Sequence, residues 1–486
     1  MDYIYEIMTE FIISSAQDSK LLYVLEAFSQ HDLNRFRKFI HSPYFNQQEK
    51  LTTLFDMLLP ALKDQTSEYP DKAKIFKQLF KTKYNDVKMR RAFSDLLKLA
   101  EDFMAYERFG ERHAHMLSDT LHATNIRGLS KNFETNYNLA KNIQSKKQDH
   151  DADFYFTEFL LEVEMNQHIE LQKQRTEKKN LENVLDNLDS FYFITKLLYA
   201  CAIEHYRNIL NIDLRVVLID AILAQASDTK YQSIPSITAY TAIYYMLREK
   251  DGEIHYQELK QLLQKEKHLP ATTERDAYIF SINFCVKQIN RGKLDYLREV
   301  FDLYNVALEK DFLFDRNELS PWDYKNLVTL GLRLKEQNWT EKFIKEYREK
   351  LPKSNRSNAY TFNLAKFYFY IKRYDDVLKL LQKVEYDDIF YLLDSKTLLV
   401  KTYYEMSEYS ALHSLISSFK ALLRRKRKIS DTHKKNYINL LNFINDLSRA
   451  DLRDKKELLE IKKDFDKTTQ IADAGWLREK FEELGV

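Results

Sequence analysis

Histidine, cysteine and acidic side chains at helical spacing are the residues whose types could perform chemistry. His115, Asp119 and His122 lie at i, i+4 and i+7, so on a helix they would share one face as metal ligands. Cys201 and His205 are one helical turn apart, as a thiol and an activating base would be. We interpret the first set as a chance arrangement without a fourth ligand, and the second as core residues. No metal, cofactor or catalytic residue is therefore predicted.

Motifs of the common enzyme classes are absent from the sequence. It contains no His-Glu-x-x-His, no paired-cysteine motif and no Gly-x-Ser-x-Gly, and its seven glycines are too dispersed for a phosphate-binding loop. We therefore predict that the chain is not an enzyme.

The densest run of charge is basic. It comprises Arg424, Arg425, Lys426, Arg427 and Lys428. Such a run could bind phosphate, an acidic protein or RNA. It is also typical of a cationic helix C-terminus followed by a loop, which is the interpretation that we favour. Both interpretations stay open.

An internal repeat indicates the elements that would position binding residues. Six positions recur with identical internal spacing: Leu364, Ala365, Tyr368, Tyr374, Val377 and Leu381 reappear as Leu399, Val400, Tyr403, Tyr409, Leu412 and Ile416. Two further units are predicted upstream, at Leu330, Gly331, Leu334, Phe343 and Tyr347, and at Phe284, Cys285, Leu297 and Phe301. This pattern predicts antiparallel helix pairs stacked side by side, with a small residue where two helices cross.

The repeated unit resembles the tetratricopeptide-repeat family. Asn363-Leu364-Ala365, Tyr368 and Tyr374-Asp375-Asp376 match the family pattern, and residues 278–423 carry the resemblance. Val400 and Cys285 replace the usual small residue, so the repeat is divergent. The resemblance implies a right-handed α-solenoid whose first helices line a concave groove for a peptide.

In this register, one groove would collect lysines and aromatic rings from successive units. The residues expected to line it are Phe362, Asn363, Lys366, Phe369, Tyr370, Lys401 and Tyr404, with Lys325 and Lys335 from the preceding unit. Asn363 with Lys366 matches in type a pair that related repeat proteins use to clamp carboxylates. Lysines framed by aromatic rings suit an acidic or carboxylate-bearing peptide.

Composition predicts an all-α protein. Gly and Pro number only seven each in 486 residues, so few residues are available to break helices. The net charge of +2 provides no global field for nucleic acid or membrane. Cys201 and Cys285 cannot build a disulfide framework, and no signal-like or membrane-spanning apolar run occurs. We expect a soluble, cytoplasmic protein without a membrane partner.

Four regions are predicted along the chain. Residues 1–112 form an N-terminal helical domain, 113–270 degenerate helical repeats with a long amphipathic helix, 271–423 the tetratricopeptide-like repeats, and 424–486 a basic loop with C-terminal capping helices. Within the first region, Pro60 and residues 64–70 are expected to end a helix and form a loop.

Two functions follow from these patterns. The first is a non-enzymatic scaffold that binds a protein or peptide, an acidic one being favoured, in the concave groove. The alternative is a nucleic-acid-associated or regulatory protein that uses Arg424–Lys428 or the basic N-terminal helices. On those helices, Lys83, Lys88, Arg90 and Arg91 precede Ser94, and Arg35, Arg37 and Lys38 lie on an earlier helix.

Overall fold

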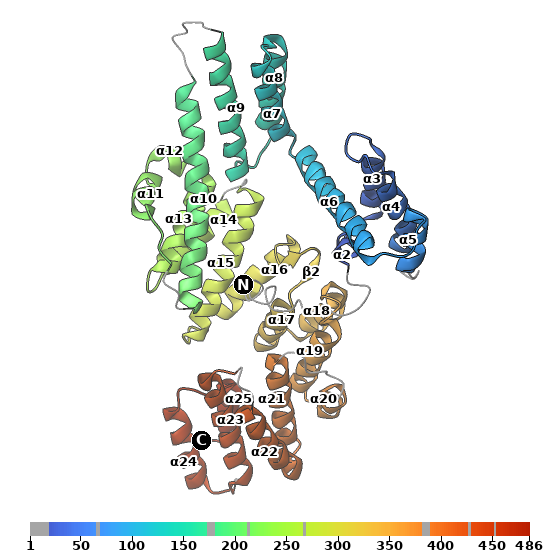
Figure 1. The fold of residues 1–486 in the computed structure, drawn as a ribbon. Helices are drawn as coiled ribbons and strands as arrows, with labels where there is room; N and C mark the ends of the chain where they lie inside the picture. Colours follow the sequence, from blue (N-terminus) through green and yellow to red (C-terminus); the bar gives the residue numbers. More distant parts are fainter. Residues whose placement is uncertain are drawn as a thin grey trace. The chain divides into compact units, whose positions relative to one another are not determined.

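The chain folds into α-helices. The computed structural model describes residues 19–64, 69–172, 180–210, 214–265, 269–381, 389–425, 429–451 and 453–486 (Figure 1). The only strands in these ranges are β1 (Phe314–Asp315) and β2 (Glu318–Leu319), a short antiparallel hairpin. The chain divides into two compact units, Met1–Leu198 with Ile219–Ile237, and Tyr199–Leu218 with Thr238–Val486. The all-α prediction is confirmed.

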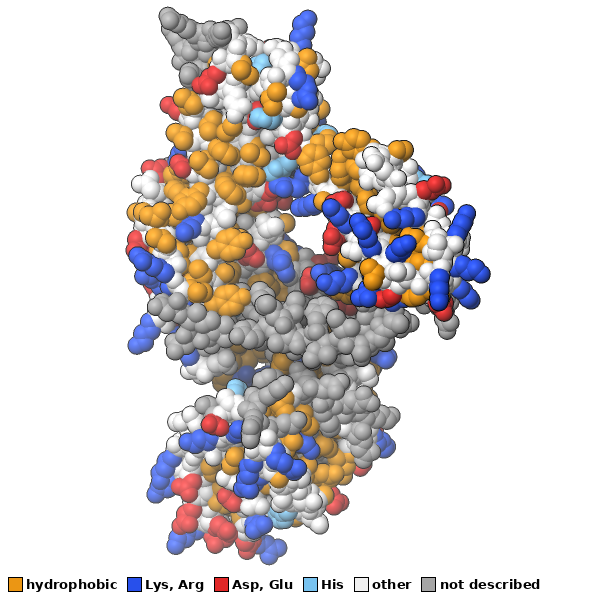
Figure 2. All heavy atoms as spheres, in the orientation of Figure 1, with side chains coloured by type: hydrophobic (Ala, Val, Ile, Leu, Met, Phe, Trp, Pro, Cys, Tyr) orange, Lys and Arg blue, Asp and Glu red, His pale blue; other side chains and the backbone are white. Residues whose placement is uncertain are grey.

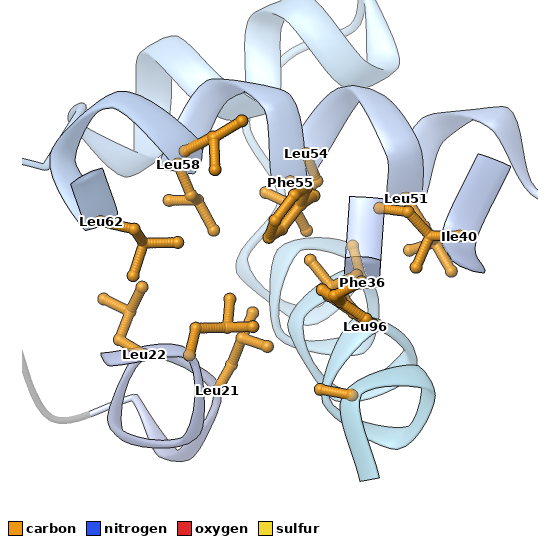
Figure 3. Close-up of a cluster of buried hydrophobic side chains, with 14 of the residues drawn as sticks. Leu21, Leu22, Phe36, Ile40, Leu51, Leu54, Phe55, Leu58, Leu62 and Leu96 are labelled. Carbon is orange, nitrogen blue, oxygen red and sulfur yellow. The ribbon is translucent and has the colours of Figure 1, made fainter. Parts of the chain in front are cut away.

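In the part of the first unit that the structure describes, five helices come first. They are α2 (Lys20–Glu26), α3 (Gln30–His41), α4 (Glu49–Lys63), α5 (Lys72–Phe80) and α6 (Asp86–Glu111). Their apolar stripes meet in one core, in which Phe36, Leu54 and Leu96 are completely buried (Figure 3). This core lies within residues 1–112, for which the sequence predicts an N-terminal helical domain.

Helix α4 differs from the prediction at Pro60. We expected the helix to end there, but it continues to Lys63. A proline lacks the N–H that would bond one turn back, which usually breaks a helix. Here Ala61 and Leu62, which follow Pro60, are both buried in the core, so packing holds this last turn helical.

The rest of the first unit is also helical. Its helices are α7 (His113–Ile126), α8 (Ser130–Ser145), α9 (Ala152–Leu171), α10 (Leu181–Leu210, which continues into the second unit), α11 (Ile219–Ala226), α12 (Thr229–Gln232) and the start of α13 (Pro235–Arg248). Residues 173–179, between α9 and α10, lie outside the described residues.

The second unit continues with α14 (Glu253–Lys265) and a run of helix pairs. The pairs are α15 (Ala271–Asn290) with α16 (Tyr296–Glu309), α17 (Pro321–Arg333) with α18 (Gln337–Glu346), α19 (Arg356–Tyr370) with α20 (Tyr374–Leu381), and α21 (Ile389–Glu405) with α22 (Tyr409–Arg425). A short 3₁₀ helix, η1 (Arg348–Lys350), follows α18. The chain ends with α23 (Asp431–Arg449), α24 (Lys455–Lys467) and α25 (Ala474–Glu483).

The same turn closes the first helix of all four pairs. The N–H groups of Lys293, Glu336, Arg373 and Glu408 donate to the carbonyl groups of Gln288, Gly331, Tyr368 and Tyr403 over 3.1, 2.8, 2.8 and 2.9 Å. The residues just before these donors, Gly292, Lys335, Lys372 and Ser407, have φ angles of 93°, 61°, 61° and 58°. This is a Schellman motif, in which a left-handed residue satisfies the last carbonyls of a helix.

These turns correct the repeat register that we expected for the second pair. The residue eight positions before the N–H donor of the turn is Cys285, Ala365 and Val400 in the other three pairs. In the second pair this residue is Val328 rather than Gly331. All four side chains are completely buried. The sequence misled because Leu330-Gly331 imitates Leu364-Ala365, while the polar Thr340 stands at the position of Val377 and Leu412. The expected register was therefore wrong by three residues, almost one helical turn.

The last helices bury a separate apolar cluster. Trp476, Leu477 and Phe481 of α25 pack with residues of α21 to α24, and Leu440 and Ile444 of α23 lie at the centre. Helix α25 lies in the region 424–486, where we expected capping helices, and it contributes its apolar face to this cluster. None of the helices within the described ranges has the length and apolar character to cross a membrane.

Candidate functional site

Three of the lysines that were expected to line the groove lie on successive first helices. Lys325 is on α17, Lys366 on α19 and Lys401 on α21; we call these residues the lysine row. Helices α17, α19 and α21 pack against one another in this order, so the row crosses them. Lys335, which was expected beside them, lies in the turn that follows α17.

Lys325 already has an acidic partner. Its Nζ pairs with a carboxylate oxygen of Asp394 on α21, and the hydroxyl of Tyr437 donates to the other oxygen over 3.3 Å. The ammonium also lies 5.0 Å from the Trp322 ring centre and 5.9 Å from that of Tyr391. At this end of the row, a lysine therefore binds a carboxylate next to two aromatic rings.

Lys401 repeats the same arrangement with a residue far along the chain. Its Nζ lies 2.6 Å from Oδ2 of Asp473, just before α25. The ammonium lies 4.9 Å from the Phe369 ring centre and 5.5 Å from that of Trp476. Burial alone would raise the pKa of Asp473, but the Lys401 ammonium outweighs it, so this pKa lies below its ordinary value. The Lys401 side chain is 11 % exposed and that of Asp473 42 %, so Asp473 is the more accessible partner of the pair.

Lys366 lies between the two pairs and has no acidic contact of its own among the described residues. Its Nζ lies 2.6 Å from the hydroxyl oxygen of Thr329. Burial lowers the pKa of Lys366 to about 8, and the neighbouring Lys325 ammonium adds to the effect. The three lysines of the row are thus paired with only two aspartates, Asp394 and Asp473, so the row can accept a further negative charge.

The C-terminal helix α25 closes over one end of the row. The indole N–H of Trp476 donates to Glu405 over 3.1 Å, and Lys480 Nζ lies 2.7 Å from the same carboxylate. The Tyr404 ring contacts the Trp476 ring at 5.4 Å between centres. The chain's own Glu405 and Trp476 therefore provide the carboxylate and the aromatic ring at this end of the row.

The seven residues expected in the groove are only partly brought together. Lys366, Phe369, Lys401 and Tyr404 lie in or beside the row, and Tyr370 is half-buried at the end of α19. Phe362 is instead buried against the Tyr391 ring, 5.4 Å away. Asn363 is completely buried and donates to the Ala359 carbonyl of its own helix. These two residues have no open surface to offer a peptide, which corrects their expected place.

Sequence reasoning missed the acidic half of the site. The acids Asp394 and Asp473 were not expected in the site, nor were Trp476 and Lys480 beside them. Asp394 lies 69 residues from Lys325 in the chain, and Asp473 lies 72 residues from Lys401. Because the repeat pattern stops before residue 430, it gives no signal for a contact from the last helix.

The histidine pattern does not converge into a metal site. His115 Nε2 lies 3.3 Å from Asp153, whereas His122 Nδ1 lies 3.1 Å from Glu164, and Asp119 is exposed. No group of three potential ligands that could hold a metal ion occurs among the described residues. The Cys201 thiol is buried and donates to the Tyr240 carbonyl over 3.2 Å; burial raises its pKa, which disfavours the nucleophilic thiolate.

The basic run is described only at its start. Arg424 and Arg425 form the last turn of α22, where cations complement the exposed carbonyls of a helix end. Lys426, Arg427 and Lys428 lie outside the described residues.

Comparison with known proteins returned no relative for this chain. No protein-family profile matches it, and no curated protein or solved structure shows significant similarity.

Proposed function

We propose that the chain is a non-enzymatic scaffold of tetratricopeptide-like helix pairs that binds an acidic segment of a protein or peptide along the lysine row. The observation that carries the proposal is the 2.6 Å contact between Lys401 and Asp473 beneath the rings of Phe369 and Trp476. It is the recognition expected for a carboxylate ligand, made here with the chain's own carboxylate.

Support for an external ligand comes from the charges of the row. Lys366 is left without an acidic contact among the described residues, and Asp473 is the more exposed partner of its pair. A carboxylate from another chain could contact Lys366 and replace Asp473 at Lys401. The recurring turns and completely buried positions of the four helix pairs support a solenoid framework for such a row. The two buried free cysteines support action in a reducing compartment such as the cytoplasm.

Peptide display with the full-length chain tests this function. We expect selected peptides to be rich in Asp and Glu next to aromatic residues. Asp473→Asn should tighten their binding because it removes the internal competitor, and Lys366→Glu with Lys401→Glu should weaken it about tenfold or more.

A matched charge reversal provides the control. Lys353 and Lys455 are exposed lysines of the same unit that lie outside the row. Lys353→Glu with Lys455→Glu should therefore leave binding almost unchanged. Selected peptides without acidic residues, or equal loss in the two double variants, would contradict the proposal.

A further inference from the structure

A second charged surface lies in the first unit, apart from the lysine row. Residues 72–91 span α5, the following turn and the start of α6, and contain eight Lys or Arg against one acid, Asp86. We call this surface the basic corner; its cations are Lys72, Lys74, Lys77, Lys81, Lys83, Lys88, Arg90 and Arg91. All eight side chains are exposed, and Figure 2 shows Lys and Arg crowded around α5.

The cations of the basic corner are largely unpaired within the described part of the chain. Arg90 pairs with Asp86 over 2.6 Å, and none of the other seven makes an ion pair there. The earlier basic helix behaves differently, since Arg35 pairs with Glu107 at 2.9 Å and Arg37 with Asp56 at 2.8 Å. Two basic helices acting together, as in a helix-turn-helix, are therefore not favoured. The unmatched charge is concentrated at the basic corner.

An aromatic pocket opens within the same corner. It has a volume of about 440 Å³ and is lined by Ala73, Phe76, Lys77, Lys81, Thr82 and Tyr84. The Tyr84 ring meets Phe76 edge-on at 5.1 Å between centres, and Tyr84 remains 44 % exposed. A flat apolar group can thus lie against Tyr84 while Lys77 and Lys81 hold an anion beside it.

We propose that the basic corner binds single-stranded nucleic acid, with one unstacked base in the Phe76–Tyr84 pocket and neighbouring phosphates on the lysines. Proteins that bind single strands combine a cationic track with aromatic side chains on which bases stack. Charge complementarity requires a polyanion, and the pocket favours one that carries flat rings. The bases of a duplex are stacked inside it and cannot enter the pocket. This surface is separate from the proposed peptide site and does not depend on it.

Fluorescence anisotropy with the full-length chain tests the proposal. The probe is a labelled oligouridine of about ten nucleotides, a length suited to a single-strand site. Binding should weaken steeply with salt. In Lys77→Gln/Lys81→Gln/Lys83→Gln, the slope of log affinity against log salt should decrease by about 2, since each phosphate contact contributes about 0.7.

The stacking step has its own pair of variants. Tyr84→Ala should lose about tenfold in affinity, whereas Tyr84→Phe keeps the ring and should bind as the wild type does. Lys38 and Lys98 are exposed lysines of the same unit outside the corner. Lys38→Gln/Lys98→Gln should therefore retain the wild-type affinity.

Three results would overturn the proposal. The first is an affinity that the triple lysine variant and the Lys38→Gln/Lys98→Gln control reduce equally. The second is equal binding of oligouridine by Tyr84→Ala and Tyr84→Phe. The third is binding of polyglutamate or of phosphatidylserine vesicles that matches or exceeds binding of the oligonucleotide, since this would assign the corner to an acidic protein or a membrane surface. Circular dichroism of each variant separates lost binding from lost folding.

Discussion

Lys366 lowers the stability of the fold through its buried ammonium, and the same ammonium is a proposed contact for a ligand carboxylate. Its ammonium is enclosed by helices and flanked by Lys325, and its polar contact is the uncharged hydroxyl of Thr329. Because burial disfavours the charged form, the folded protein holds this proton less tightly than the unfolded chain does. The buried Lys366 ammonium lowers the stability of the fold, and a ligand carboxylate that pairs with it would offset this cost.

The pH dependence of stability tests this state of Lys366. Its pKa is about 8 in the folded chain and 10.5 in the reference state, so the unfolded chain binds more protons between these values. Stability should therefore rise with pH across that window, by on the order of 1–2 kcal/mol relative to Lys366→Met, after allowance for partial solvent screening. Urea unfolding of both proteins from about pH 7 to pH 10 measures the difference. Parallel stability curves would show that Lys366 is solvated like an ordinary lysine.

Residue types alone could predict only half of the candidate site. Lys366, Lys401, Phe369 and Tyr404 were accessible from their spacing, because side chains at fixed helical offsets share a face. Asp473 was not accessible, because its position depends on how the last helix packs, and nothing in its local sequence encodes that contact. Lys401 therefore looked like a free cation although the chain neutralises it.

At the scale of elements, the crossing of α17 and α18 depends on a glycine. A Cβ added to Gly331 would come within 2.3 Å of the Thr340 hydroxyl oxygen and 3.3 Å of the Trp339 ring. The sequence prediction that a small residue stands at a helix crossing is thus correct for Gly331, although its place in the repeat register was wrong. Spacing alone could not separate these two properties, because a glycine fits either position in the pattern.

A double-mutant cycle tests this crossing. Gly331→Ala should destabilise the protein by about 1–3 kcal/mol, since the packed interface has no space for the methyl group. In a Thr340→Ala background the hydroxyl is absent, so the same change should cost much less, and the better helix propensity of alanine offsets part of the remainder. The free energy of unfolding of the four proteins gives the coupling. A coupling near zero would mean that the helices separate freely and that the close approach is not required.

At the scale of the whole chain, composition and patterning predicted the class of fold. They did not predict which helices pack against one another. The scarcity of Gly and Pro correctly gave an all-α protein, and the repeated spacing located the four helix pairs. Within the second unit, the main packing runs between helices one or two places apart in the chain, from α14 to α25. Longer-range contacts, such as that of Lys325 on α17 with Asp394 on α21, are added by single side chains.

Because packing runs mainly between helices that are close in the chain, we expect a core truncation to destabilise only the helices around it. Leu440 on α23 and Val300 on α16 are both completely buried, on helices that are far apart in the chain order of the second unit. Truncation of either to Ala should cost about 2–5 kcal/mol for Leu440 and somewhat less for Val300, because a cavity replaces lost contacts. In a linear array, opening need not spread beyond adjoining elements.

Hydrogen exchange resolves where each truncation acts. Leu440→Ala should accelerate amide exchange in α22 to α25 about tenfold or more and leave α15 and α16 protected, and Val300→Ala should give the converse pattern. The two variants are controls for each other, since each removes apolar volume from only one of these two regions. If either substitution accelerates exchange equally from α15 to α25, the second unit opens as a single cooperative body. Stability would then have to come from long-range contacts, and the lysine row, which connects α17, α19, α21 and the start of α25, would be the first place to look for them.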